Sequence, residues 1–397
     1  MRVCLHTIWP VVNPPLGGTE RFLVDFAKEL TALGYEAFIC CTGPDGFATV
    51  EGVDVIYRLP ASFKKGFQAA QGNVVKMVRS IVQDSSNVED ALRKLGNLVE
   101  CQVADMKYDV LHLNSFVSAA YSTSIRPIVV TNHENPKEYE HYWGDQLIPE
   151  MAHLVRSGRT QLNRAFRLAV PSRHYADDYS AMFQLHVESI PLGISLGRFP
   201  AFSSRDKIQE PAGPKTILVP SRLEPHQKGQ DIAIRACGIL ARQGEDVRVV
   251  LSGVRDDNKH HVAPMRKLAH AESLHDRLVI RRFQDILEGY RSCHVVVSPE
   301  RYCSYGLSIS EALALGTPTV LSRIPTYLEI AAKVPHAFFF NPDDVEDLAE
   351  QLRKALACDS SQRSRNAIQF RRANDLRRCA IEYGTRYEMA MDNRSAP

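Results

Sequence analysis

The feature that most constrains the fold is a strand–loop–helix–strand pattern around residue 300. Residues 294–298 and 319–322 are short apolar runs rich in Val and Leu, which indicates two buried strands. Between them, residues 307–315 carry apolar side chains at helical spacing, with Gly306 before and Gly316 after the run. A helix that connects two such strands places them parallel. The pattern therefore predicts a parallel α/β unit.

The loop before this helix is suited to holding a phosphate group. The first turn of a helix offers backbone N–H groups without intrahelical acceptors, and the helix dipole favours an anion there. Glu311 follows on the same helix face as Leu307 and Ser308. An acid at this place can accept hydrogen bonds from the hydroxyls of a phosphate-bearing sugar. The alternative is an ordinary doubly wound unit in which Glu311 is simply solvated.

The rest of the chain also alternates between strands and helices, which predicts parallel doubly wound sheets. A chain of 397 residues exceeds one hydrophobic core, so two domains are expected. The boundary is placed in a Pro- and Gly-bearing stretch between residues 191 and 213. Further strands are expected at 3–6, 37–41, 109–113, 128–132, 168–171, 216–220, 247–252 and 278–281, and helices at 21–33 and 230–240.

Residues 63–103 break this rhythm and indicate one or two helices instead. Within 63–80 the apolar side chains alternate with basic ones. A basic amphipathic helix can lie on a membrane surface or contact an anionic acceptor. It can equally be a solvated helix packed on its own domain, and both alternatives stay open.

Composition excludes several classes of protein. A net charge of +2 argues against a dedicated nucleic-acid binder. The 9 Cys form no CxxC pair, so the sequence shows neither a zinc motif nor a disulfide framework, which favours a reducing cytoplasm. No apolar run is long enough to span a membrane, and the first residues do not fit a signal peptide.

Two cations follow directly on the strand expected at 216–220. Arg222 and Lys228 would lie at the carboxyl edge of a sheet, where open α/β sheets bind ligands. Together they suit a diphosphate, Arg by its planar fork and Lys as a point charge. The alternative is a pair of solvated surface cations.

Two features of the first half could also belong to a site. Gly17 and Gly18 allow close backbone approach to a ligand and positive φ, or they merely form a tight turn. His133 follows the strand expected at 128–132, where it could donate a hydrogen bond or handle a proton. A purely structural histidine is the equal alternative.

Taken together, these residues resemble the retaining glycosyltransferases of family 4, which have the GT-B fold. The resemblance covers nearly the whole chain. It rests on Gly-Gly-x-Glu at 17–20, Thr-x-His at 131–133, Pro-Ser at 171–172, Arg-Leu at 222–223 with Lys-Gly at 228–229, Pro-x-x-Tyr at 299–302, Glu-Ala-Leu-Ala at 311–314, Gly-Thr-Pro at 316–318 and a final helix near 376–391.

The resemblance implies an α/β fold of two doubly wound Rossmann-like domains that face a cleft. Residues 1–192 would form the acceptor-side domain and residues 193–375 the nucleotide-sugar-binding domain. Residues 376–397 would hold a closing helix that crosses back to the first domain.

The resemblance also implies a role for each candidate residue on the donor side. Arg222 and Lys228 would clamp the donor diphosphate. The amides of Leu307 and Ser308 would bind the distal phosphate, and Glu311 would hold the ribose hydroxyls. No metal or cofactor would be needed, because the two cations neutralise the leaving diphosphate.

The remaining candidates would lie nearer the transferred sugar. Gly17 and Gly18 would bring the first domain against the donor, and His133 would lie beside the anomeric centre. Gly306 would open the phosphate-binding helix.

The chain departs from the family pattern at Cys303, where the first of two Glu residues is expected. That Glu usually contacts hydroxyls of the transferred sugar, and a neutral thiol is a poor replacement. Three explanations stay open: an unusual donor sugar, another group such as Glu300 in its place, or lost activity. Leu192, where the family often has Asn, affects a loop near the hinge.

The sequence thus predicts retaining transfer of a hexose-type sugar from a nucleoside diphosphate, UDP or GDP, to an acceptor hydroxyl. The acceptor is a glycan, a lipid-linked sugar or a small metabolite. A non-catalytic nucleotide-sugar-binding subunit, or GT-B chemistry such as epimerisation or phosphorolysis, is the alternative. A cytoplasmic protein is expected, with peripheral membrane contact through residues 63–80 as an option.

Overall fold

The computed structural model describes residues 1–15, 17–115, 128–133, 147–158, 160, 162, 165–201, 211–256, 258–283, 285–359 and 363–392. The chain divides into two compact units. The first unit is Met1–Ser195 with Leu376–Pro397, and the second unit is Leu196–Asp375. The second unit therefore begins at Leu196, whereas the sequence predicts that the second domain begins at residue 193.

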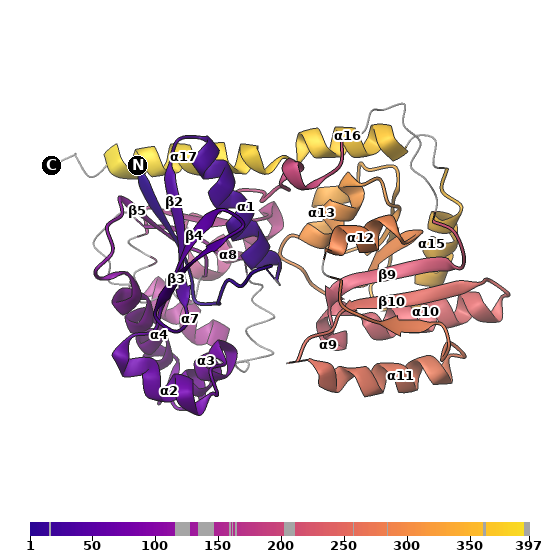
Figure 1. Cartoon of the computed structure of the whole chain (residues 1–397), viewed down its shortest axis with the longest axis horizontal. Helices are drawn as coiled ribbons and strands as arrows, with labels where there is room; N and C mark the ends of the chain where they lie inside the picture. Colours follow the sequence, from indigo (N-terminus) through magenta and orange to yellow (C-terminus); the bar gives the residue numbers. More distant parts are fainter. Residues whose placement is uncertain are drawn as a thin grey trace. The chain divides into compact units, whose positions relative to one another are not determined.

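The first unit is built on an eight-stranded sheet in the order β3-β4-β2-β1-β5-β6-β7-β8 (Figure 1). The pair β3–β4 is antiparallel, and the other pairs are parallel. The strands are β1 (Arg2–Thr7), β2 (Glu36–Thr42), β3 (Gly46–Val50), β4 (Val53–Arg58), β5 (Val110–Leu113), β6 (Ile128–Thr131), β7 (Arg167–Val170) and β8 (Glu188–Ser189). The helices are α1 (Gly18–Ala32), α2 (Lys64–Ala69), α3 (Val74–Gln83), α4 (Val88–Val103), α7 (Leu147–Arg156), α8 (Arg173–Phe183), α17 (Leu376–Asp392) and the 3₁₀ turn η1 (Ala61–Phe63).

The second unit has a six-stranded parallel sheet in the order β11-β10-β9-β12-β13-β14. The strands are β9 (Lys215–Arg222), β10 (Val247–Gly253), β11 (Leu278–Ile280), β12 (Val295–Ser298), β13 (Thr319–Ser322) and β14 (Ala337–Phe340). The helices are α9 (Pro225–Lys228), α10 (Gln230–Arg242), α11 (Val262–Ala271), α12 (Ile286–Arg291), α13 (Leu307–Ala314), α14 (Pro325–Ala331), α15 (Val345–Leu356), α16 (Arg363–Ala373) and the 3₁₀ turns η3 (Leu196–Arg198) and η4 (Lys259–His261).

Two doubly wound sheets are thus confirmed, and every strand expected from the sequence lies within two residues of its expected bounds. Both sheets have a topological switch point, where successive strands turn to opposite sides. In the first unit it lies between β1 and β5, and in the second between β9 and β12. Open α/β sheets bind ligands beyond the carboxyl ends of the strands at such a point.

The prediction of one or two helices over 63–103 is wrong, because the structure has three α-helices there. Asn73 and Asn87 are N-caps, and each side chain accepts a backbone N–H three residues later, at 3.0 and 2.9 Å. Capping asparagines favour a new helix start over a continuous helix. Gln71 and Gly72 add a turn with φ of 56° and 74° before α3.

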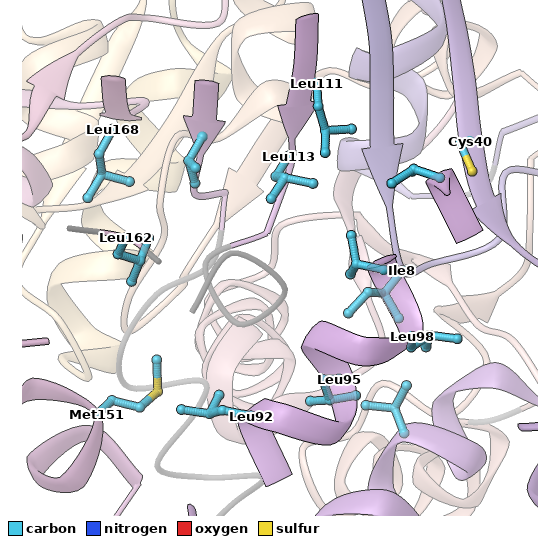
Figure 2. Close-up of a cluster of buried hydrophobic side chains, with 14 of the residues drawn as sticks. Ile8, Cys40, Leu92, Leu95, Leu98, Leu111, Leu113, Met151, Leu162 and Leu168 are labelled. Carbon is cyan, nitrogen blue, oxygen red and sulfur yellow. The ribbon is translucent and has the colours of Figure 1, made fainter. Parts of the chain in front are cut away.

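The apolar side chains of this region face the core of their own unit. Val74 and Val78 are buried in it, and Phe63 and Phe67 pack against it. Figure 2 shows leucines of α4 facing leucines of β5. The basic residues Lys64, Lys65, Lys76 and Arg79 are exposed. Packing on its own domain therefore accounts for the apolar face, while membrane contact stays an untested prediction. In the described part of the chain, no helix is long and apolar enough to cross a membrane.

The last helix, α17, belongs to the first unit and packs against α1 (Figure 1). Gly384 allows the close approach, because a Cβ there would lie 2.6 Å from the Tyr35 hydroxyl oxygen. Tyr35 Oη donates to Glu388 at 3.0 Å, and Arg386 Nε lies 2.6 Å from Glu188. The helix is therefore fixed at several points along its length.

Candidate functional site

The candidate donor site is built around the switch point of the second unit. β9 and β12 are paired there, with Ile217 opposite Val295. The chain leaves β9 through Arg222 and enters α9, which ends at Lys228. The chain leaves β12 into the loop that opens α13. The two loops that carry most of the candidate residues therefore begin at neighbouring strand ends.

Backbone contacts hold these two loops together. Gly229 has φ of 65°, and a Cβ there would lie 2.1 Å from the carbonyl oxygen of Pro299. The backbone N–H of Arg301 donates to Gln227 O at 2.9 Å. The Arg301 guanidinium donates to the carbonyl oxygens of Pro225 and His226, at 2.7 and 3.0 Å. Arg301 thus closes the carboxyl end of α9 and fixes it against the loop after β12.

Lys228 is placed beside a carboxylate by this arrangement. Its ammonium lies 2.9 Å from Glu300 Oε2, and the two side chains are only 16% and 3% exposed. Arg222 lies at the end of β9, where its Nη2 donates to Glu224 Oε2 at 2.7 Å. Both predicted phosphate-binding cations therefore lie at the carboxyl edge of the sheet. Each forms an ion pair there with a nearby carboxylate.

The helix that was expected to bind phosphate begins as predicted. Gly306 is its N-cap with φ of 92°, and a Cβ there would lie 2.7 Å from the ring of Tyr327. Only glycine combines this backbone conformation with so close a neighbour. Leu307 and Ser308 form the first turn, where backbone N–H groups lack intrahelical acceptors. These donors remain a predicted phosphate site.

Glu311 is buried on α13, and its carboxylate is contacted by Arg198 and Tyr290. Arg198 Nη1 lies 2.5 Å from Oε1, and the Tyr290 hydroxyl donates to Oε2 at 3.3 Å. Burial and the neighbouring carboxylate raise the pKa of Tyr290 well above its ordinary value, so this hydroxyl keeps its proton. These two contacts hold the carboxylate in one orientation.

Cys303 is a buried thiol rather than a nucleophile. Its side chain lies near Glu300, and burial followed by that negative charge raises the pKa of the thiol far above its usual value. A thiol that keeps its proton at neutral pH is a poor nucleophile. Its carbonyl oxygen accepts the Thr326 hydroxyl at 2.7 Å.

In the first unit, His133 lies two residues after the end of β6. Its Nε2 lies 3.1 Å from Asn114 Oδ1, and its ring packs against Phe22 with 5.1 Å between centroids. The amide oxygen can only accept, so Nε2 carries the hydrogen. Burial lowers the pKa of His133 to about 3, and the ring is neutral at pH 7.

The paired glycines do not adopt the positive φ that their sequence allowed. Gly17 is extended, with φ of −112°, and Gly18 is the first residue of α1. The backbone N–H of Gly17 donates to Glu20 Oε2 at 2.6 Å, which is the half of a capping box that needs no N-cap side chain. Their conformation is set by a helix start, because the carboxylate of Glu20 closes back onto the N-cap.

Next to His133, a buried hydrogen-bonded network joins β5 and β6 to α17. His112 Nδ1 lies 2.7 Å from the Tyr387 hydroxyl, and His112 Nε2 lies 2.7 Å from the Thr131 hydroxyl. Thr131 is also 2.5 Å from the hydroxyl of Tyr383. The final helix is thus connected to the strand ends of the first unit.

Sequence reasoning did not find Arg198, Tyr290 and Arg301 and named Glu300 only as an alternative. Arg198 and Glu311 are 113 residues apart, so no local pattern pairs them. Glu300 carried a usable signal, since an acid two residues after a buried strand lies at the carboxyl edge of the sheet.

Comparison with known proteins bears on both units. Residues 201–372 match the family model "Glycosyl transferases group 1", and residues 16–198 match "Glycosyltransferase Family 4". The chain is homologous to glycosyltransferases of the GT-B type. The sucrose-phosphate synthase of Thermosynechococcus elongatus has the same fold, with a TM-score of 0.74 and 17% identity over 99% of both chains. The Anabaena protein HepE, solved with UDP-glucose, superposes with a TM-score of 0.65 and 17% identity over 100% of this chain and 99% of its own.

Two curated relatives match this chain over about half of its length. D-inositol 3-phosphate glycosyltransferase of Pseudarthrobacter chlorophenolicus is 27% identical over 240 residues, which are 55% of each chain. Mannosylfructose-phosphate synthase of Agrobacterium fabrum is 28% identical over 189 residues, 45% of this chain and 41% of its own. The chain thus matches about half the length of these relatives, and their substrates are not carried over by the similarity.

Proposed function

We propose that this protein is a retaining glycosyltransferase of family 4 that moves a sugar from a UDP- or GDP-linked donor to an acceptor hydroxyl. The observation that carries the proposal is the convergence of two loops at the switch point of the second unit. One loop delivers Lys228, and the other opens α13 at Gly306. Arg301 and Gly229 bind the two loops to each other.

The chemistry of this edge suits a nucleoside diphosphate. Negative charge develops on the leaving diphosphate, and fixed cations and backbone donors aimed at it lower the barrier most effectively. Arg222 and Lys228 supply the charge, and Leu307 and Ser308 supply the donors. Glu311 accepts the ribose hydroxyls, because its carboxylate is oriented by Arg198 and Tyr290.

We assign the contacts with the transferred sugar and with the acceptor to residues of the first unit. His133 follows β6 at the carboxyl edge of the sheet and is neutral, with its N–H directed to Asn114, so its Nδ1 can accept a hydrogen bond from a sugar hydroxyl without adding charge. We assign it to the donor sugar near the anomeric carbon, with Gly17 and Gly18 at the start of α1. The acceptor is a glycan, a lipid-linked sugar or a small metabolite.

The first test is a donor screen. UDP-, GDP-, ADP- and dTDP-sugars are added to the protein, and the thermal unfolding midpoint is measured, since a ligand that binds the native state raises it by mass action. Release of free nucleoside diphosphate from the best donor then separates transfer from epimerisation without donor cleavage, from phosphorolysis and from binding without turnover.

The second test is Lys228→Ala, with Lys215→Ala as the matched control. Lys215 is paired with Glu245 at 2.7 Å, at the amino end of β9 and thus at the opposite edge of the sheet. Loss of a charge that stabilises the leaving group is expected to slow release of nucleoside diphosphate by on the order of 100-fold. The control should keep normal turnover. A folded Lys228→Ala protein with normal turnover would contradict the assignment.

A further inference from the structure

Glu300 is a buried carboxylate that the proposed reaction does not yet use. Its side chain is 3% exposed, and its Oε2 lies 2.9 Å from Lys228 Nζ. Among the residues that the structure describes, Lys228 is its hydrogen-bond partner. The ion pair therefore lies inside the candidate donor site and not on the surface.

Backbone contacts hold the two residues of this ion pair next to each other. Gly229 is in contact with Pro299, and Arg301 is hydrogen-bonded to Gln227 through its backbone N–H. Lys228 directly precedes Gly229, and Glu300 lies between Pro299 and Arg301. Any anion that reaches Lys228 therefore also approaches Glu300.

A diphosphate bound at Lys228 would compete with Glu300 for the same ammonium group. A buried carboxylate that loses its cation is costly unless other donors replace the lost interaction. The neighbouring side chains are already engaged. The Tyr327 hydroxyl is 2.7 Å from Ser298 Oγ, and the Arg301 guanidinium binds two carbonyl oxygens and Asp343. Hydroxyl groups of a ligand can supply the replacement.

We propose that Glu300 accepts hydrogen bonds from hydroxyl groups of the transferred sugar and so selects which sugar is transferred. The inference rests on the proposed function, because it needs a nucleotide sugar whose diphosphate lies at Lys228. The hydroxyl-bearing sugar next to that diphosphate supplies neutral donors. Cys303 lies in the same loop, but its protonated thiol is a weak hydrogen-bond partner. Glu300 therefore provides the acidic group that position 303 lacks.

The test compares a nucleoside diphosphate with its own sugar derivative. Dissociation constants are measured by calorimetry for UDP and UDP-glucose, and for GDP and GDP-mannose, with the wild-type protein and with Glu300→Gln. Glu245→Gln is the matched control, because Glu245 is also paired with a lysine but lies at the opposite edge of the sheet. The readout is the ratio of the two constants within each pair, which cancels any change in diphosphate binding.

For the pair that binds wild type best, Glu300→Gln should reduce the preference for the sugar derivative by about tenfold or more, as expected for a lost hydrogen bond to a carboxylate. Binding of the diphosphate alone should be unchanged or tighter, since a negative charge has been removed beside it. Glu245→Gln should change neither quantity.

Three outcomes distinguish the ideas. An equal loss for diphosphate and sugar derivative would mean that Glu300 only positions Lys228, and this overturns the inference while the proposed function stands. Unchanged affinity for both ligands overturns it likewise. Absence of binding by wild type to every nucleotide would overturn the proposed function and the inference together.

A second measurement does not depend on the folding of a variant. Wild-type protein is titrated with donors that lack one sugar hydroxyl at a time. At least one deoxy donor should bind about tenfold more weakly than the parent, which is the cost of leaving a buried acceptor unpaired. Equal affinity for all of them overturns the inference. In Glu300→Gln, the discrimination against that deoxy donor should disappear.

Discussion

Replacement of Arg198 by Met tests how strongly the Arg198–Glu311 pair stabilises the second unit. The side chains are 20% and 9% exposed, so the pair is largely removed from water. Breaking a fully buried pair costs about 3–5 kcal/mol because one charge is left uncompensated. Arg198 is still partly solvated, and Tyr290 continues to donate to the other carboxylate oxygen. We therefore expect Arg198→Met to lower the unfolding free energy by roughly 2–3 kcal/mol.

The assay can isolate the second unit because both tryptophans of the chain, Trp9 and Trp143, lie in the first. Tryptophan fluorescence during urea unfolding therefore reports on the first unit, while far-UV circular dichroism reports on both. Arg198→Met should shift the dichroism transition to lower urea and leave the fluorescence transition in place, provided that the units unfold independently.

Two control experiments separate the effect of a buried charge from the loss of any ion pair. Arg242→Met removes the partner of Glu272 from an ion pair whose side chains are 52% and 20% exposed, and should cost less than about 1 kcal/mol. In a Glu311→Gln background, Arg198→Met should cost much less than in wild type, because the buried charge is already gone. Equal costs in both backgrounds would refute the view that a desolvated charge dominates.

Three further perturbations have outcomes fixed by the structure. Gly229→Ala should destabilise the second unit by more than about 1–2 kcal/mol and weaken nucleotide binding, because the new methyl group collides with the Pro299 carbonyl oxygen. Gly384→Val should release α17 from Tyr35, seen as faster proteolysis of that helix. The unfolding free energy of the first unit should fall as pH drops below 6.5, by about 2 kcal/mol at pH 5 from His112 alone, because the folded protein holds this ring neutral, with its pKa lowered to about 3, while the unfolded chain protonates it.

Each of these has a matched control. Gly244 also has a positive φ, of 91°, but no neighbouring atom lies within 4 Å of its added Cβ, so Gly244→Ala measures backbone strain without a collision. Thr385→Val keeps a β-branched side chain on the exposed face of α17 and should not release the helix. His112→Asn should reduce the pH dependence and exposed His186→Asn should not. The reverse result for any pair would contradict the corresponding contact.

The central strands and α13 were predictable because the pattern that identifies each element lies within its own residues. Runs of Val and Leu bounded by Gly and Pro mark buried parallel strands, and Gly306 and Gly316 mark the helix between two of them. The β3–β4 hairpin was missed although its turn is visible. Glu51 and Gly52 both have positive φ, of 49° and 85°, which suits a two-residue hairpin turn.

The partners of the candidate residues could not be read from the sequence. Lys228 and Glu311 stand in recognisable motifs, but the acids and bases that meet them come from elsewhere. Glu300 reaches Lys228 across 72 positions, and Arg198 reaches Glu311 across 113. Such pairings depend on which strand ends are neighbours and on the path of each loop, and these are properties of the assembled sheet.

The grouping of α17 with the first unit has a consequence for the order in which the chain folds during synthesis. The first unit is interrupted by the whole of Leu196–Asp375, and Leu376 N–H donates to Ile194 O at 2.9 Å to close the gap. On the ribosome, Tyr383 and Tyr387 emerge only after the last residue of the second unit. Until then, His112 Nδ1 lacks the Tyr387 hydroxyl and Thr131 lacks the Tyr383 hydroxyl, while His112 Nε2 and Thr131 can already pair with each other. The continuous second unit, although later in the sequence, can therefore complete its fold before the first.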